Sequence, residues 1–531
     1  MIRNPGGPDI RRRRPLALVA GNSAWNLLAF AVGVLANLIT LPFVVRHLGI
    51  YQFGICGLLL ALATPLSLVG TALGQSAAQG IARHLSQDDP VAVSEFCATM
   101  ITIGISSIAG IGLFLGLTAP IIARGLFPKY ESSFQSIGLV SMTLAFGWMA
   151  QQLSLLMQGV HVACQSYRRI ATVTAIGAIG GPLFVFGIVS GKPDVEGYIL
   201  ALALGYGLTT LTWFVSIITS FPWCLRRPSL YPRMTKSIAS FSGWQMLSQL
   251  VAIMASQIDR YLLGAWVSAN AVGYYNVSQR LEEVAYIGVI RTGDALFPQF
   301  SVNAGETVDR QSEIFFRASW MLNLVAGMVI APLLVWAPSL LLVWVGIETS
   351  QFATPVLRVL AVGGLLGCAG NVFSLYALGV AKTRYTALLS VTTAVTTTVA
   401  SVVLLRTFGF AAAGIGGVAG MLVNVVVMIG LTRSHFGDYG NARRIFAAIV
   451  LPIGTALAVA AALTCIRMPI QNSWPRVIIG YSATSLLILL SILVTTGLTR
   501  EGGASRADLR RLAQLPLSWL NDLAFQRRHR S

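Results

Sequence analysis

Charged side chains stand inside long apolar runs of this 531-residue chain, where burial is costly unless a partner compensates them. Three groups lie in neighbouring runs: Asp259 with Arg260, Arg280 with Glu283, and Arg291 with Asp294. Carboxylates bind protons or cations, and a guanidinium group binds phosphate or carboxylate through two parallel hydrogen bonds. The chemistry that these residues offer is therefore ion binding, internal ion pairing or recognition of an anion.

Helical periodicity decides which of these side chains point the same way. Successive residues of a helix point about 100° apart, so Asp259 and Arg260 lie on different faces although they are neighbours. Arg260 shares its face with Gln245 and Gln249. Four runs carry polar faces of this kind, although neutral polar groups also join helices in lipid. The residues that we predict to line a polar cavity are Asn26, Asn37, Arg46, Gln75, Gln79, Gln245, Gln249, Arg260, Arg280, Glu283, Arg291 and Asp294.

Depth separates the charged groups further. Arg280 and Glu283 lie about ten residues into their run, about 15 Å deep, near the middle of a bilayer. Two interpretations stay open: the pair neutralises itself at i, i+3, or a cavity brings it water and an anionic ligand. Arg260 has no acid three or four residues away, so its partner is Asp259, a carboxylate of the next run or a ligand. In that next run, Glu282 points nearly opposite to the face that carries Arg280. The candidates for ion coupling are Asp259, Glu283 and Asp294.

Other kinds of chemistry lack their signatures. The six cysteines have no C-x-x-C spacing, the five histidines have no metal-binding spacing, and no phosphate-binding loop of the G-x-x-x-x-G-K-[ST] type occurs. The connections between apolar runs are too short to hold an extramembrane domain. We therefore expect no metal, no cofactor and no enzymatic activity.

The elements that carry these residues are membrane-spanning helices. Hydrophobic residues make up 55% of the chain and charged residues only 11%, and uninterrupted apolar runs recur along it. Such runs lack the alternation of barrel strands. The sequence predicts an all-α polytopic membrane protein with about fourteen spans, at 17–45, 53–80, 96–121, 135–160, 170–190, 198–221, 238–266, 271–300, 316–341, 353–380, 385–405, 409–432, 445–466 and 475–498.

The net charge of +18 follows membrane topology. With a cytoplasmic N-terminus, the cytoplasmic segments hold 26 of the 37 Lys and Arg residues, which is the positive-inside pattern. We expect a plasma membrane location, both termini in the cytoplasm, and no nucleic-acid partner. The tail after 498 mixes arginine with Leu, Trp519 and Phe525, which favours contact with anionic lipid.

An internal repeat divides the chain. LPFVVRHLGIYQFG has a counterpart in SQIDRYLLGAWVSANAVGYY, with Arg46, Gly49 and Gly54 corresponding to Arg260, Gly264 and Gly273. Repeats of this kind are common in secondary transporters. We predict a basic N-terminus (1–15), an N-lobe of six helices (16–222), a basic linker (223–237), a C-lobe of six helices (238–435), a further helix pair (436–498) and a basic amphipathic tail (499–531).

The two repeat segments, with TALGQSAAQGIAR after the first and NVSQRL after the second, resemble polysaccharide flippases of the multidrug/oligosaccharidyl-lipid/polysaccharide exporter superfamily. The resemblance implies two lobes around a central cavity that carry an undecaprenyl-pyrophosphate-linked oligosaccharide across the bacterial inner membrane by alternating access. A polysaccharide polymerase and export machinery are the implied protein partners. A lipid II flippase, a small-molecule antiporter of the same superfamily and a non-transporting assembly partner are the alternatives.

Overall fold

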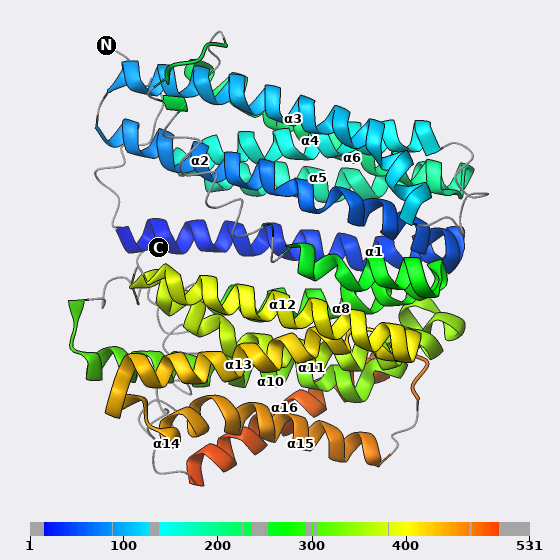
Figure 1. Ribbon diagram of the computed structural model, residues 1–531, viewed down its shortest axis with the longest axis vertical. Helices are drawn as coiled ribbons and strands as arrows, with labels where there is room; N and C mark the ends of the chain where they lie inside the picture. The colour runs from blue at the N-terminus through cyan, green and yellow to red at the C-terminus, as the bar shows by residue number, and fades with distance from the viewer. Residues whose placement is uncertain are drawn as a thin grey trace, which may run out of the picture. The chain divides into compact units, whose positions relative to one another are not determined.

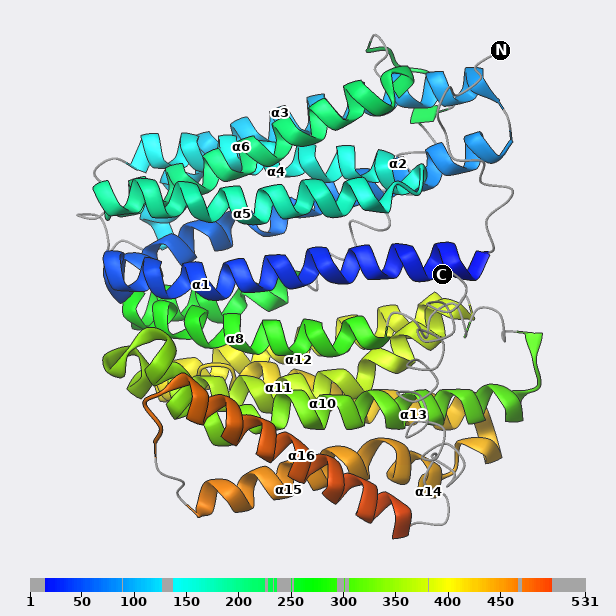
Figure 2. The same ribbon diagram turned by 180° about the vertical axis from the view of Figure 1, so that it is seen from behind.

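The computed structural model describes residues 15–87, 89–126, 137–224, 228–232, 234–235, 250, 253–293, 300, 305–380, 382–466 and 470–498. Within these ranges every regular element is a helix (Figures 1 and 2), which confirms the predicted all-α class. Eleven of the described helices are long and apolar enough to cross a membrane. The chain is therefore a multi-pass membrane protein.

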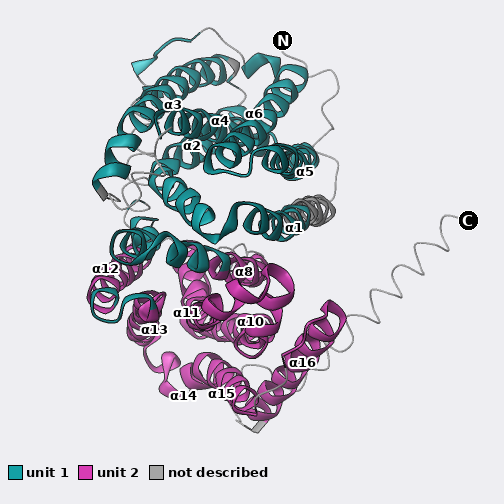
Figure 3. Cartoon of the chain, turned by 90° about the vertical axis from the view of Figure 1, so that its right-hand side faces the viewer, with its two compact units in different colours: residues 1–277, 405–410 teal, residues 278–404, 411–531 magenta. Residues whose placement is uncertain are grey.

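The chain divides into two compact units (Figure 3). Unit 1 holds residues 1–277 and 405–410, and unit 2 holds 278–404 and 411–531. The long helices of unit 1 are α1 (Pro15–Ala63), α2 (Leu68–Ser86), α3 (Pro90–Leu126), α4 (Ile137–Ala163), α5 (Tyr167–Gly191) and α6 (Val195–Ser220). Helix α8 (Ala269–Gly293) contributes residues to both units. Unit 2 contains most of α12 (Thr383–Phe408), together with α10 (Val308–Val345), α11 (Ile347–Gly379), α13 (Ile415–Phe436), α14 (Ala442–Ile445), α15 (Leu451–Cys465) and α16 (Trp474–Leu498).

Helix α1 is longer than the first predicted span and is broken inside. Gly49 has φ 75° and ψ 160°, a conformation that residues with a Cβ rarely adopt, and the helix resumes after it as far as Ala63. A short 3-10 turn, Pro65–Ser67, then leads into α2. The predicted span 53–80 therefore consists of the end of α1, this turn and the start of α2, because proline at 65 lacks the N–H that a continuous helix needs.

The second half of the repeat is interrupted at the corresponding place. A helix over 253–262 passes into a π-helical turn, Leu263–Val267, and Ser268 is extended before α8 begins. Gly264, the counterpart of Gly49, lies in this turn. Both Leu-Gly sequences of the repeat thus mark the point where a helix is interrupted, although the backbone distortion differs.

Helix α4 is the central packing element of the first unit. It lies beside α2, α3 and α6, and its buried face approaches α2 so closely that a Cβ on Gly159 would overlap the Gly74 carbonyl. His161 is buried at the end of α4, where its Nε2 lies 2.8 Å from the Ser216 Oγ of α6. Helix α6 begins at Asp194, whose side chain accepts a hydrogen bond from the Gly197 N–H at 2.7 Å as an N-cap.

In unit 2, α10 packs against α11 on one side and against α15 and α16 on another. The contact with the last helix pair is specific: the Trp336 indole N–H donates to Thr484 Oγ1 at 2.9 Å, and the Gln471 N–H donates to Ser339 Oγ at 2.9 Å. Asn323 also donates to the Ala448 carbonyl at 3.2 Å. These bonds tie the last two helices to the core of the second unit.

Candidate functional site

The candidate site in unit 1 is built on a close helix crossing. After its break, α1 passes the start of α8 so tightly that a Cβ on Gly54 would overlap the carbonyl oxygen of Ala269. On the other side, a Cβ on Gly273 would meet the carbonyl oxygen of Ile50. Glycine at both crossing positions lets the two backbones touch, and it places the next turns of both helices next to the 253–262 helix.

Arg260 sits one turn beyond this crossing and joins two helices. Its Nε donates to Asn276 Oδ1 of α8 at 2.7 Å, and its Nη1 donates to Gln257 Oε1. The Gln257 amide in turn donates to Ser256 Oγ at 3.2 Å. The Asn276 amide lies where a side chain at Gly57 of α1 would be, so glycine at that position makes room for it. The guanidinium is thus held by two buried amides.

Asp259 makes a different contact from its neighbour. It is buried, with 4% of its surface exposed, and its Oδ2 accepts a hydrogen bond from the Tyr275 hydroxyl at 3.3 Å. Tyr261 reaches the other way and donates to the Ala61 carbonyl of α1 at 2.7 Å. Consecutive residues of SQIDRYLLG therefore hold separate partners, as the helical periodicity predicts.

Arg280 and Glu283 form the ion pair that one of the two open interpretations describes. Arg280 Nη1 lies 2.9 Å from Glu283 Oε2, at i, i+3 on α8. Their side chains remain 39% and 43% exposed. The pair is therefore accessible from outside the helix, and guanidinium is a group that binds anions through its N–H donors.

The other residues predicted to line the cavity are either exposed or outside the part of the chain whose side chains are described. Five of the predicted residues are exposed: Asn37, Arg46, Gln75, Gln79 and Arg291. The Asn37 side chain donates to the Gly33 carbonyl of its own helix at 2.9 Å. Gln245, Gln249 and Asp294 lie outside the described residues, and Asn26 is described only as part of the α1 backbone.

Family comparison agrees with this architecture. Residues 19–304, more than half of the chain, match the family described as "Polysaccharide biosynthesis protein". The chain belongs to this family. A curated relative, "Teichuronic acid biosynthesis protein TuaB" of Bacillus subtilis (strain 168), is 30% identical over 153 residues, which are 27% of this chain and 31% of that protein. The chain thus matches about a third of the length of this curated relative.

Solved structures share the fold of this polysaccharide biosynthesis family member. The structure titled "Lipid II flippase MurJ, inward closed conformation" has a TM-score of 0.66 at 9% identity, covering 89% of this chain and 97% of that one. An inward-facing multidrug resistance MATE family transporter of the MOP superfamily has a TM-score of 0.64 at 17% identity, covering 78% and 98%. These similarities confirm the predicted superfamily fold, and at such identities they establish the fold alone.

The family match covers both Arg260 with its amides and the Arg280–Glu283 pair, since all of them precede 304. Sequence reasoning misses Gln257 and Tyr275, which the structure brings to Arg260 and Asp259. For Gln257 the spacing carried a signal, because it lies three residues before Arg260 on an adjoining part of the same helix face. No local spacing indicates the contact of Tyr275, which comes from α8.

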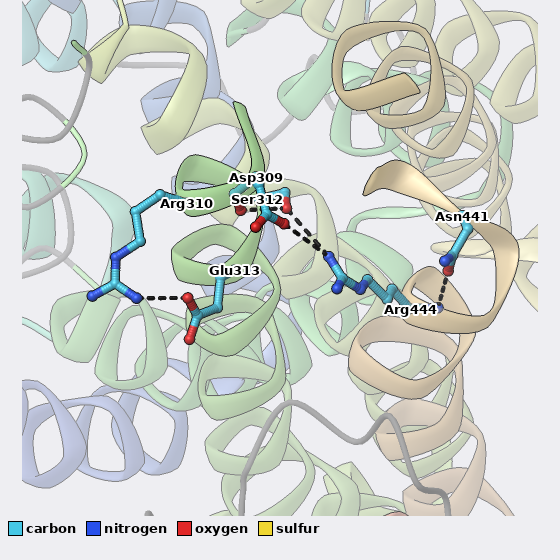
Figure 4. A network of polar contacts seen from close by, with 6 residues as sticks. All are labelled: Asp309, Arg310, Ser312, Glu313, Asn441 and Arg444. Atoms are coloured by element: carbon cyan, nitrogen blue, oxygen red, sulfur yellow. Dashed lines mark hydrogen bonds and ion pairs between the residues drawn. The ribbon is translucent and has the colours of Figure 1, made fainter. Parts of the chain in front are cut away.

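A second polar network lies in unit 2, outside the family match (Figure 4). Arg444 Nη1 donates to Ser312 Oγ at 3.4 Å and lies 3.9 Å from Asp309 Oδ1, so it joins α14 to the first turn of α10. The Arg444 N–H is capped by Asn441 Oδ1 at 2.9 Å, and Arg310 pairs with Glu313 beside it. The charged side chains of this network are 37–60% exposed, whereas Ser312 is buried.

Proposed function

We propose that this chain flips an undecaprenyl-pyrophosphate-linked oligosaccharide repeat unit across the bacterial inner membrane, for the synthesis of an exopolysaccharide or an O-antigen-type polymer. The membership of residues 19–304 in the polysaccharide biosynthesis family carries the proposal. The relative in Bacillus subtilis is named for the biosynthesis of teichuronic acid, and the solved neighbours are a lipid flippase and drug transporters.

The charges of the described site fit such a cargo. A pyrophosphate carries negative charge on oxygens that guanidinium binds through two hydrogen bonds. Arg280 is exposed beside Glu283, and Arg260 is hydrogen-bonded to the amides of Gln257 and Asn276. In this proposal Arg260 or Arg280 binds the pyrophosphate head group, while alternating access carries the cargo from the cytoplasmic leaflet to the outer one.

The test uses the purified full chain in liposomes. The probe is a fluorescent undecaprenyl-pyrophosphate-linked oligosaccharide in both leaflets, bleached from outside by a membrane-impermeant reductant. We expect wild-type protein to expose the whole lipid pool to the reductant, whereas protein-free liposomes protect about half of it because only the outer leaflet is reachable. Protection of half of the pool in the presence of folded protein overturns the proposal.

A lipid II flippase is the second candidate, because 97% of the MurJ structure aligns with the fold of this chain. The same assay with fluorescent lipid II separates the two. Bleaching of the whole lipid II pool, with the oligosaccharide lipid protected, would assign the chain to cell-wall precursor transport. Uptake of a cationic drug by the same liposomes, with both lipids protected, would instead indicate an antiporter.

A further inference from the structure

Glu282 is a carboxylate of α8 that lies against the backbone of α11. Its Oε1 occupies the place that a side chain at Gly364 would take, and its carboxyl carbon would be 3.4 Å from a Cβ at that position. Ile330 of α10 closes the same spot from another side, 3.7 Å from that Cβ position. Glycine at 364 is therefore what allows the carboxyl group to contact a neighbouring helix directly.

This contact lies far from the ends of both helices. Gly364 is 17 residues from the first residue of α11 and 15 from the last, and α11 is one of the candidate spans. Glu282 lies about 20 Å from one end of α8 and about 16 Å from the other, at 1.5 Å per residue. The short side chain therefore cannot carry the carboxyl group to either end of its helix.

The groups around Glu282 are mostly apolar or acidic. Arg358 of α11, six residues before Gly364, is occupied elsewhere, because its Nε donates to the Leu334 carbonyl of α10 at 2.9 Å. The titratable groups that interact with it are Glu283 and Tyr286 of α8 and Cys368 of α11. Ile330 of α10 lies near Glu282 at Gly364. One turn along α11, Gly367 faces both the Tyr286 ring and Met421 of α13. Within the described ranges no basic side chain hydrogen-bonds to or ion-pairs with Glu282, and the nearest arginine in sequence, Arg280, pairs with Glu283 instead.

A carboxylate cannot stay ionised in such a place without a large free-energy cost, whereas a neutral carboxylic acid can. We propose that Glu282 is a proton-binding site that controls the packing of α8 against α11. A proton taken from water bonds to a carboxylate oxygen and lets the two helices touch at Gly364. Return of that proton to water leaves a charge that drives the side chain out of the contact.

The first test needs no transport and so does not depend on the proposed function. In lipid nanodiscs at neutral pH, exposed carboxyl groups are ionised, and a protonated one is visible through its C=O stretch in the infrared spectrum. We expect this band in wild type and in Glu348→Gln, which removes an exposed acid at the start of α11, and its loss in Glu282→Gln. Undiminished intensity in Glu282→Gln overturns the inference.

The second test links the site to transport and rests on the proposed function. A gradient of one pH unit supports up to about tenfold accumulation of a cargo coupled to one proton. We expect liposomes with wild type or Glu348→Gln to redistribute the fluorescent lipid between leaflets when the gradient is imposed, and those with Glu282→Gln not to respond. A full response in Glu282→Gln contradicts the inference, whereas an absence of flipping by wild type contradicts the proposed function and leaves the infrared result to decide.

Discussion

The Arg260 guanidinium holds amide side chains from two different helices, Gln257 from its own and Asn276 from α8. Both amides are buried, with 5% and 9% of their surfaces exposed. Their oxygens therefore depend on the arginine for donors, because water has little access. At this scale the site is a guanidinium group whose position is set by amide side chains of two helices.

Removal of Arg260 is expected to lower both stability and transport. Arg260→Ala leaves the oxygens of Gln257 and Asn276 without this donor, at a cost of about 1–3 kcal/mol each. Arg260→Lys keeps the charge but loses the planar fork that reaches both amides. We expect a lower melting temperature for both variants in detergent, with alanine the more severe. Arg476→Ala, at an exposed site at the start of α16, is the matched control and is expected to melt like wild type.

Charge reversal distinguishes an internal ion pair from an anion site at Arg280 and Glu283. If the 2.9 Å pair only stabilises α8, Arg280→Glu is damaging and the double variant Arg280→Glu/Glu283→Arg restores stability and flipping together. If Arg280 binds pyrophosphate, the double variant restores the melting temperature but not flipping. We expect the second outcome. Recovery of wild-type flipping rates in the double variant would exclude a direct role for Arg280 in cargo binding.

At the scale of helices, two glycines of the repeat decide how closely α1 and α8 cross. Gly54 faces the Ala269 carbonyl, and Gly273 faces the Ile50 carbonyl. Because these neighbours are backbone atoms, they cannot rotate away as a side chain would. The crossing therefore fixes the position of the turn that carries Asn276, and through it the position of Arg260.

Alanine at either crossing glycine is expected to prevent folding or to separate the helices. Gly54→Ala and Gly273→Ala both push backbone against backbone, and overpacking of this kind costs about 1–3 kcal/mol or more. We expect less monodisperse protein in size-exclusion chromatography after extraction. Gly33→Ala is the control on the same helix, because no atom lies within 4 Å of the added Cβ. Equal yields of all three variants would show that the close crossing is not required.

For the whole molecule, hydropathy predicts the helical class and the multi-pass character because each span must satisfy its own backbone in lipid. The repeat is inferred from matching arginine and glycine positions, and its two Leu-Gly sequences lie where helices are interrupted, at Gly49 and in the 263–267 turn. The contact partners of individual side chains could not be predicted in the same way. The contact of Glu282 with Gly364 joins residues 82 positions apart, and no local spacing indicates it. Periodicity gives the face of a residue but not the neighbour on that face.

Membrane orientation is the remaining property of the whole chain, and the sequence predicts it from charge. Ser434 lies near the end of the span Ile415–Gly440, and Cys465 ends the next span, Ala442–Cys465. If both spans cross the membrane, Ser434 and Cys465 are on opposite sides of it. The basic residues Arg443 and Arg444 stand at the first end. The positive-inside rule therefore places Ser434 in the cytoplasm and Cys465 outside.

Thiol labelling of intact cells tests this orientation. Cys465 is the exposed cysteine, Cys164 is partly exposed and Cys56, Cys97, Cys224 and Cys368 are buried, so Cys465 is the cysteine that a maleimide reaches most easily. We expect a membrane-impermeant maleimide to label Cys465 from outside once the outer envelope is opened, and Cys465→Ser to lose that labelling. In the Cys465→Ser background, Ser434→Cys should react only after the inner membrane is permeabilised, since Ser434 is exposed at the other end. The reverse pattern would invert the protein, place both termini outside, and move the basic end of unit 2 away from the anionic cytoplasmic leaflet that favours it.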